Sequence, residues 1–357
     1  MAAADRAREV RPGEEIDLPR LQAWLADRLQ GFEGPIEVHQ FPAGFSNLSY
    51  LLSCGQATCV LRRPPGGTRP KSGHDMKREY TVLAALVGHF DLAPRPLLLC
   101  EDESVIGAPF YLAERLEGLI LRRDYPADLL ATPALARAQQ EALVDTLAAL
   151  HAVDYVAAGL ADLGQPEGYV ARQVHGWVGR YERARTEDAA DAAALGKWLV
   201  ENIPTTPAKT ALLHNDFKLD NVVFDRDDPR RLIGVLDWEM ATLGDQRMDL
   251  GCSLAYWIQA DDPPALAATR TLPTHVTGSL TRAQVIERYE RAANRKLESM
   301  SFFYTFGLFR LAVIAQQIYL RFVRGQTRDP RFAVLGEMTR ALLAAAEQAA
   351  AGRLLAG

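Results

Sequence analysis

The sequence has few cysteines, and none of them is arranged as in a metal site. Its 357 residues include four cysteines, and no two of them form a CxxC pair. No cluster of histidines accompanies them, which argues against a zinc site. We therefore expect four free thiols in a reducing compartment, and a cytoplasmic protein.

The chain also lacks a long uninterrupted apolar run. Its first residues carry charge and contain no apolar segment of the kind found in a secretory signal peptide. The most apolar stretch, residues 302–322, is interrupted by Arg310, Gln316 and Gln317. This pattern predicts a buried helix rather than a membrane span, so we expect no membrane partner.

An excess of positive charge is missing as well. The formal net charge is −5, from 40 Lys and Arg against 45 Asp and Glu, which gives a nucleic-acid partner no electrostatic support. The charge is uneven, because residues 259–357 contain 13 Lys and Arg against 8 Asp and Glu, a net of +5. Hydrophobic residues make up 48% of the chain, which is ordinary for a globular protein of one large domain or two lobes.

The first third of the chain has the pattern of a small sheet with one inserted helix. Short β-type runs with turn residues between them occur at 36–41, 48–53, 57–62, 96–100 and 109–114. Between the third and fourth runs, Ser72 and Asp75 have the spacing of a capping box, which predicts a helix start. Residues 1–20 are predicted to be a loose lead-in.

From about residue 116 the chain is predicted to be mostly helical. Thr132 followed by Pro133 is a typical helix start, and further helices are expected at 166–183 and 188–202. Everything from residue 246 onward is predicted to be helices with loops. Two strand-like runs, at 222–225 and 232–236, interrupt this region, so the fold class is α+β.

The segment that carries chemistry is L-H-N-D-F-K-L-D-N at 213–221, followed by V-L-D-W-E at 235–239. Asp216 and Asn221 are five residues apart, as in the catalytic-loop pattern H-R-D-L-x-x-x-N. Asp237 follows an apolar β-type run, where a second metal-binding carboxylate would sit. Phosphoryl transfer needs a carboxylate that accepts a hydroxyl proton, and oxygen ligands that hold Mg²⁺ against the phosphates.

These motifs resemble those of the aminoglycoside phosphotransferase and choline kinase family, which shares the protein-kinase fold. The variants H-x-D-F-x-L-D-N and V-L-D-W-E, followed by T-L-G-D, resemble one branch in particular. That branch contains phosphotransferase-like domains fused to, or encoded near, acyl-CoA dehydrogenases. The resemblance implies a two-lobed fold, with a small antiparallel N-lobe at 1–115 and a mainly helical C-lobe at 116–357. It also implies ATP and Mg²⁺ as cofactors.

The resemblance assigns roles to residues of the two motifs. Asp216 would be the catalytic base, and Asn221 and Asp237 would bind magnesium. Lys218 could neutralise charge on the transferring phosphoryl group, although a plain surface lysine is an equal alternative. Architectural roles are expected for two further residues that would support the catalytic loop, His214 and Asp249.

The nucleotide is expected to be held largely by the N-lobe. Residues 44–47 (Gly-Phe-Ser-Asn) lie where a phosphate-covering loop belongs, with Gly44, Ser46 and Asn47 as candidate contacts. Arg62 stands where kinases carry a phosphate-binding lysine, and an arginine can grip phosphate bidentately. Three more residues complete the expected nucleotide site: Glu79 as the helix partner of Arg62, and Glu114 and Leu116 at the hinge whose backbone meets the adenine.

Several functional alternatives remain open at this point. The acceptor is expected to be a small-molecule hydroxyl, and a hydroxyacyl-CoA or hydroxy acid is favoured by the basic C-terminal region and its aromatic run at 302–309. An aminoglycoside, macrolide, choline or homoserine-type kinase is the alternative within the same class. A non-catalytic nucleotide-binding pseudokinase is the alternative of another class, supported by Arg62 and opposed by the intact Asp216, Asn221 and Asp237. The sequence leaves the oligomeric state and the choice between ATP and GTP undecided.

Overall fold

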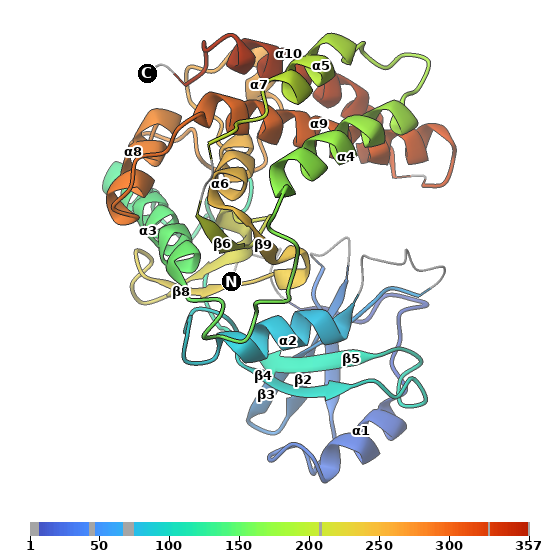
Figure 1. Cartoon of the computed structure of the whole chain (residues 1–357). Coiled ribbons are helices and arrows are strands. Elements are labelled where there is room, and N and C mark those ends of the chain that lie inside the picture. Colours follow the sequence, from blue (N-terminus) through green and yellow to red (C-terminus); the bar gives the residue numbers. More distant parts are fainter. Residues whose placement is uncertain (1–6, 43–46, 67–74, 207–208, 328, 356–357) are drawn as a thin grey trace.

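A computed structural model describes residues 7–42, 47–66, 75–206, 209–327 and 329–355, which form a small sheet-containing lobe and a larger helical lobe (Figure 1). The fold class is α+β, as the sequence predicted. All four cysteines are buried and free, in agreement with the expectation from their spacing.

The N-lobe is built on one antiparallel sheet in the order β1-β2-β3-β5-β4. Side chains of β2 alternate strictly between buried and half-buried, so Leu48, Tyr50, Leu52 and Cys54 share one face. That face packs against α1, a helix that the sequence analysis did not predict and that begins after its cap Asp17. The strands are β1 (Glu37–Gln40), β2 (Leu48–Cys54), β3 (Ala57–Arg63), β4 (Pro96–Cys100) and β5 (Phe110–Glu114), and α1 spans Leu18–Ala26.

The inserted helix α2 (Met76–Leu86) joins the sheet to the C-lobe. Asp75 caps it by accepting a hydrogen bond from the Arg78 N–H at 2.9 Å, so the helix begins at Met76. Ser72, the other residue of the predicted capping box, lies outside the described residues. Its buried residues Val82 and Leu83 belong to the same apolar cluster as the C-lobe core. The Arg78 guanidinium donates to the carbonyl oxygens of Glu239 and Ala241, which fixes the helix against the other lobe.

The C-lobe combines eight α-helices of the described chain with two short strand pairs. The pair β7 (Val222–Phe224) and β8 (Leu232–Val235) was predicted, whereas β6 (Thr210–Leu213) and β9 (Thr242–Asp245) were not. The helices are α3 (Pro133–Ala152), α4 (Tyr169–Ala184), α5 (Ala193–Glu201), α6 (Gln246–Ala255), α7 (Pro264–Ala267), α8 (Arg282–Ala292), α9 (Met300–Val323) and α10 (Leu335–Ala350).

The long helix α9 is apolar because it lies in the core of the lobe. With 24 residues and a mean hydropathy of 1.3 it is long and apolar enough to cross a membrane, yet 56% of its apolar window is buried inside the protein. Its predicted aromatic run packs inward, with Phe302, Phe303, Tyr304, Phe306 and Phe309 at most 5% exposed. The expected buried helix is therefore confirmed.

Two glycines allow α9 to cross α6 at backbone distance. A Cβ on Gly307 would overlap the carbonyl oxygen of Gly251, and a Cβ on Gly251 would overlap the carbonyl oxygen of Phe303. Neither overlap can be relieved by a side-chain rotation, because backbone atoms are involved. The crossing fixes which residues of α9 face α6, and Arg310 follows Gly307 by one helical turn.

We predict that Gly307→Ala destabilises the protein by about 1–3 kcal/mol, because the methyl group must push two packed helices apart. The matched control is Gly176→Ala in α4, where the nearest atom to a new Cβ is Arg180 Nη1 at 3.8 Å. That change should be neutral or stabilising by up to about 1 kcal/mol, because alanine is the better helix former. Urea unfolding of both variants tests this, and equal effects would contradict the proposed tight crossing.

Candidate active site

The catalytic loop between β6 and β7 is held by one buried carboxylate. Asp249 of α6 is fully buried and accepts hydrogen bonds from the backbone N–H groups of His214, at 2.6 Å, and Asn215, at 2.8 Å. Asn215 has a left-handed backbone with φ of +65°, which these contacts stabilise. Asp249 also contacts His151 Nε2 at 3.2 Å. The predicted architectural role of Asp249 is thus confirmed.

His214 connects the catalytic loop to the strand that precedes Asp237. Its ring is fully buried, with Nε2 2.8 Å from the Leu236 carbonyl oxygen and Nδ1 3.3 Å from the Asp216 backbone nitrogen, which donates to it. The backbone N–H of Leu236 in turn donates to the Asn221 carbonyl oxygen at 2.8 Å. These contacts fix the two predicted motifs relative to each other, so His214 has the architectural role that was expected.

Asp216 has one carboxylate oxygen anchored and the other available. Its Oδ2 accepts hydrogen bonds from Lys218 Nζ at 2.6 Å and from Asn221 Nδ2 at 2.8 Å. Among the described residues no side chain or backbone group bonds to Oδ1, and the side chain is 24% exposed. The anchored oxygen orients the carboxylate, while Oδ1 can accept a proton from a bound hydroxyl group.

Lys218 is a largely buried cation, with a side chain only 13% exposed between Asp216 and Asp220 Oδ1 at 3.3 Å. Burial by itself lowers the pKa of Lys218, but the two carboxylates outweigh burial and raise its pKa above the ordinary value. Lys218 is therefore charged at neutral pH. The alternative of a plain surface lysine is wrong.

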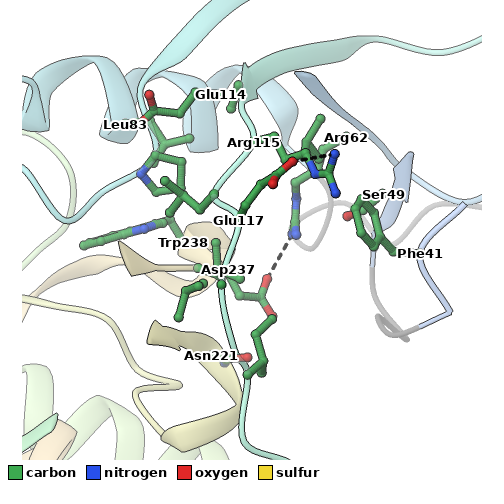
Figure 2. A pocket seen from close by; sticks show the side chains of 18 of the residues that line it. Phe41, Ser49, Arg62, Leu83, Glu114, Arg115, Glu117, Asn221, Asp237 and Trp238 are labelled. Carbon is green, nitrogen blue, oxygen red and sulfur yellow. Dashed lines mark hydrogen bonds and ion pairs between the residues drawn. The ribbon is translucent and has the colours of Figure 1, made fainter. Parts of the chain in front are cut away.

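Asp237 precedes the short helical turn Trp238–Met240 and has a left-handed conformation, with φ of +70°. Its carboxylate accepts a hydrogen bond from Arg62 Nη2 at 2.9 Å (Figure 2). Burial by itself raises the pKa of this carboxyl, but the charges of Arg62 and Lys218 outweigh burial, and the pKa of Asp237 is lowered. The side chain is thus an anion that lines the cavity between the lobes.

Arg62 on β3 is the centre of a cluster in which carboxylates outnumber cations. Its guanidinium lies 3.3 Å from Glu79, 2.9 Å from Asp237 and 3.8 Å from Glu239. The predicted pair with Glu79 is present. Burial raises the pKa of Glu79, which is 2% exposed. One arginine among three acidic side chains leaves an excess of negative potential, which favours a divalent cation nearby.

Comparison with known proteins identifies the family. A family model described as "Phosphotransferase enzyme family" matches residues 37–283. Human acyl-CoA dehydrogenase family member 11 is 35% identical over 336 residues, which cover 89% of this chain and 41% of that protein. This chain belongs to the phosphotransferase enzyme family. Mouse acyl-CoA dehydrogenase family member 10 is also similar, with 33% identity over 87% of this chain and 29% of that protein.

Solved structures agree with the family of this phosphotransferase. A candidate aminoglycoside phosphotransferase from Ralstonia eutropha is 32% identical and superposes with a TM-score of 0.80, covering 95% of this chain and 99% of that one. Choline kinase from Cryptosporidium parvum has a TM-score of 0.61 at 13% identity and shares the fold. The chain spans about two fifths of the length of acyl-CoA dehydrogenase family member 11, and the predicted resemblance to that branch is confirmed.

The side-chain oxygens of Asn221 and Asp237 suit a magnesium ion that is also bound by the phosphates of a nucleotide. No group of three or more His, Cys, Asp or Glu side chains suited to a metal occurs among the described residues. Asn221 and Asp237 both line the cavity, and the amide of Asn221 points its nitrogen at Asp216, which leaves its oxygen available. Mg²⁺ typically takes one or two protein oxygens and completes its shell with phosphates and water, so this pair fits.

The cavity between the lobes encloses about 230 Å³ and is the expected nucleotide site of the phosphotransferase. Glu114 and Leu116 line it at the point where β5 leads into the linker. The Glu114 side chain accepts a hydrogen bond from the Arg95 N–H at 2.8 Å, which holds the linker against β4. Apolar walls are provided by Val60, Ile120, Val223 and Leu236.

The expected phosphate-covering loop is described only at its end. Gly44 and Ser46 lie outside the described residues. Asn47 is 2% exposed, and its amide donates to Glu239 Oε2 at 2.7 Å. This contact ties Asn47 to the segment that follows Asp237. Glu239 is a residue beside the cavity that the sequence analysis did not single out. Its signal was present in the sequence, since it ends the V-L-D-W-E motif.

We predict that Asp249→Asn lowers the free energy of unfolding by about 2–4 kcal/mol at pH 7, because an amide NH₂ must then face buried N–H donors. Burial raises the pKa of Asp249, but hydrogen bonds from His151 and from the His214 backbone outweigh it, and the pKa is lowered. The stabilisation by this carboxylate is therefore present above about pH 4 and is lost as the pH falls through the folded-state pKa.

The difference in stability between wild type and Asp249→Asn should consequently shrink in acid. Denaturant unfolding between pH 3 and 8 measures it. Asp228→Asn is the control, because Asp228 is exposed and bonds only within its own turn and to Arg230. It should leave stability near wild type, and a similar loss in both variants would contradict the special role of Asp249.

Proposed function

We propose that this protein transfers the γ-phosphoryl group of ATP to a hydroxyl group of a small molecule, with Mg²⁺ as cofactor. The observation that carries the proposal is the state of Asp216. One of its oxygens is anchored by Lys218 and Asn221, and the other is unbonded and partly exposed. This arrangement, beside a cavity lined by Arg62 and Asp237, is the requirement of phosphoryl transfer.

The nucleotide would occupy the cavity between the lobes. Its adenine would meet the backbone at Glu114 and Leu116, and its phosphates would replace carboxylates as partners of Arg62. Gly44, Ser46 and Asn47 would cover the phosphates. Magnesium, bound to Asn221 and Asp237, would neutralise charge on the phosphates when present.

The reaction would use Asp216 as the base. The acceptor hydroxyl would donate to Oδ1, and its proton would pass to this carboxylate as the new oxygen–phosphorus bond forms. The bond from the γ-phosphorus to the bridging oxygen would break, and ADP would leave. Lys218, fixed beside Asp216, would offset negative charge on the transferring group.

For the acceptor we propose a hydroxyacyl-CoA or a related hydroxy acid. A polycationic aminoglycoside would instead need free carboxylates, and the C-terminal region could offer Asp261, Asp262, Glu287 and Glu290. Three of them form ion pairs with basic neighbours, and the fourth, Asp261, bonds to Gln259. The pairs are Asp262 with Arg282, Glu287 with Arg291, and Glu290 with Lys296.

One argument for this acceptor is wrong, however. The aromatic run at 302–309 was expected to help form an acyl site, but its aromatic side chains are buried in the core of the C-lobe. Within the chain itself, support for an anionic acceptor therefore comes from the basic residues. The similarity to parts of acyl-CoA dehydrogenase family members adds to it, although the chain spans only part of their length.

We predict that Asp237→Asn weakens Mg·ATP binding more than Asp216→Ala does, because a hard cation loses affinity directly when a carboxylate leaves its shell. Asp216→Ala should instead bind Mg·ATP almost normally and lower the transfer rate by about 10²–10⁴. Calorimetric titration of both variants with Mg·ATP measures the first effect, and ADP release measures the second. Equal nucleotide affinities would mean that Asp237 is not a ligand.

The acceptor class is tested by ADP release over 3- and 4-hydroxyacyl-CoAs, free hydroxy acids and kanamycin-type drugs at matched concentrations. We expect turnover with the first two classes, and turnover about 10²–10⁴-fold slower in Asp216→Ala, because Asp216 is the proposed base. Efficient turnover of the drug alone would favour the antibiotic-kinase alternative. Binding of ATP without turnover of any alcohol would favour the pseudokinase.

A further inference from the structure

Arg310 is a buried cation that forms no ion pair with a described carboxylate. Its side chain lies on α9 and is 8% exposed. The two other buried arginines of the C-lobe are both paired, Arg247 with Asp245 at 2.7 Å and Arg282 with Asp262.

The surroundings of Arg310 keep it charged. Burial by itself lowers the pKa of Arg310, but Cys252, Tyr256 and Asp216 outweigh burial and raise its pKa. Because no described carboxylate lies at ion-pair distance, the guanidinium can still bind an added anion.

The position of Arg310 places it beside the catalytic loop. Ser253 of α6 donates to the Phe217 carbonyl oxygen at 2.6 Å, and Lys218 Nζ lies 5.6 Å from the centre of the Tyr256 ring. The end of α6 therefore supports the loop that carries Asp216. Arg310 packs against this same segment from α9, where the Gly251–Gly307 crossing brings the helices together.

The other wall of this region is α4. The Tyr169 hydroxyl at its start donates to Asn215 Oδ1 at 3.0 Å, next to Asp216. Two turns later Trp177 lies 5.4 Å from the Arg310 guanidinium, measured to the ring centre. Neither Arg310 nor Trp177 lines the nucleotide cavity, so both lie on the C-lobe side of Asp216. This is the side left for the acceptor.

More unpaired arginines continue outward along α4. The Arg180 guanidinium lies 4.5 Å from the Trp177 ring centre, and the exposed Arg183 follows one turn later. Neither forms an ion pair with a described carboxylate. Burial lowers the pKa of Arg180, and the charges of Arg183 and Arg310 lower it further, so the three arginines act on one another as like charges. An anion that runs from Arg310 to the surface would relieve this repulsion.

We propose that Arg310 binds the carboxyl group of the acceptor while the acceptor's hydroxyl group lies on Asp216. A carboxylate or a thioester carbonyl offers the oxygen lone pairs that a guanidinium requires. Arg310 would thereby select alcohols with a carboxyl group a few bonds from the hydroxyl, and Arg180 would meet further negative charge. Polycationic acceptors would be repelled. The inference rests on the proposed function and names the residue that determines its specificity.

The test compares acceptors that differ only in the carboxyl group. 4-Hydroxypentanoate, its CoA thioester and the neutral 1,4-pentanediol are assayed with wild type, Arg310→Gln and Arg310→Lys. Arg310→Gln should raise KM for the acid and the thioester about 10- to 100-fold. A change of this size corresponds to the loss of one charge-assisted hydrogen bond. Arg310→Lys should be intermediate. The KM for ATP and the turnover of the diol should stay within about twofold of wild type, because Arg310 is proposed to contact neither the ATP nor a group that the diol carries.

Arg321→Gln is the matched control, because Arg321 lies on the same helix three turns away and is exposed. It should behave as wild type with every acceptor. An equal loss of activity with acid and diol in Arg310→Gln would overturn the proposal and make Arg310 a support of the catalytic loop. An unchanged KM for the acid would overturn it as well. If Arg310→Gln fails to fold, the comparison of acid and diol in Arg310→Lys decides.

Calorimetric binding of 4-hydroxypentanoate and its thioester separates this inference from the proposed function. If wild type phosphorylates none of these compounds, the proposed acceptor class fails. Carboxylate binding that is present in wild type and lost in Arg310→Gln would still support the anion site. Binding that is absent, or equal in both proteins, would refute it. The same titrations show whether the free acid or the thioester binds more tightly, and therefore which form of the carboxyl group Arg310 binds.

Discussion

The buried carboxylate of Asp249 is the interaction on which the active site depends. It lies on α6, receives the backbone N–H groups of His214 and Asn215, and contacts His151 of α3. Asn215, next to the proposed base Asp216, has a left-handed backbone, and such a conformation persists only when the surrounding contacts hold it in place. With the loop fixed, Asp216 can keep one oxygen bonded and the other open, which is the state that general-base chemistry needs.

Two arginines near Asp216 lie in different electrostatic surroundings. Arg62 stands among three carboxylates, so its surroundings carry excess negative charge and suit a metal ion with nucleotide phosphates. Arg310 forms no ion pair with a described carboxylate, and the positive charge of Arg180 lies near it, so its surroundings suit an anion. Asp216 lies between these two regions. The charge distribution alone thus separates a nucleotide side from an acceptor side, and it argues for an acceptor unlike a polycationic drug.

The family relationship and the site geometry support each other at different levels. Similarity over residues 37–283 establishes a phosphotransferase of this family, and the superposition with the Ralstonia eutropha protein extends over 95% of the chain. Neither comparison names an acceptor for this chain, since one fold serves many substrates. The unpaired arginines beside Asp216 supply the physical reason to prefer a carboxyl-bearing alcohol.

The sequence by itself determined the five strands of the N-lobe sheet, α2, the strand pair β7 and β8, and the order of the two motifs. These features are local, because the alternation of apolar and polar residues in strands, helix capping and motif spacing each involve residues that are close together in the sequence. Strands β6 and β9 went unpredicted because each is four residues long and is stabilised only by its distant partner. The aromatic run at 302–309 and Arg310 are neighbours in sequence, yet the tertiary structure sends the first into the core and the second towards the active site. Only the packing of α9 on α6 decides that, because adjacent residues of a helix lie about 100° apart around its axis and a rotation of that size would change which of them faces the core.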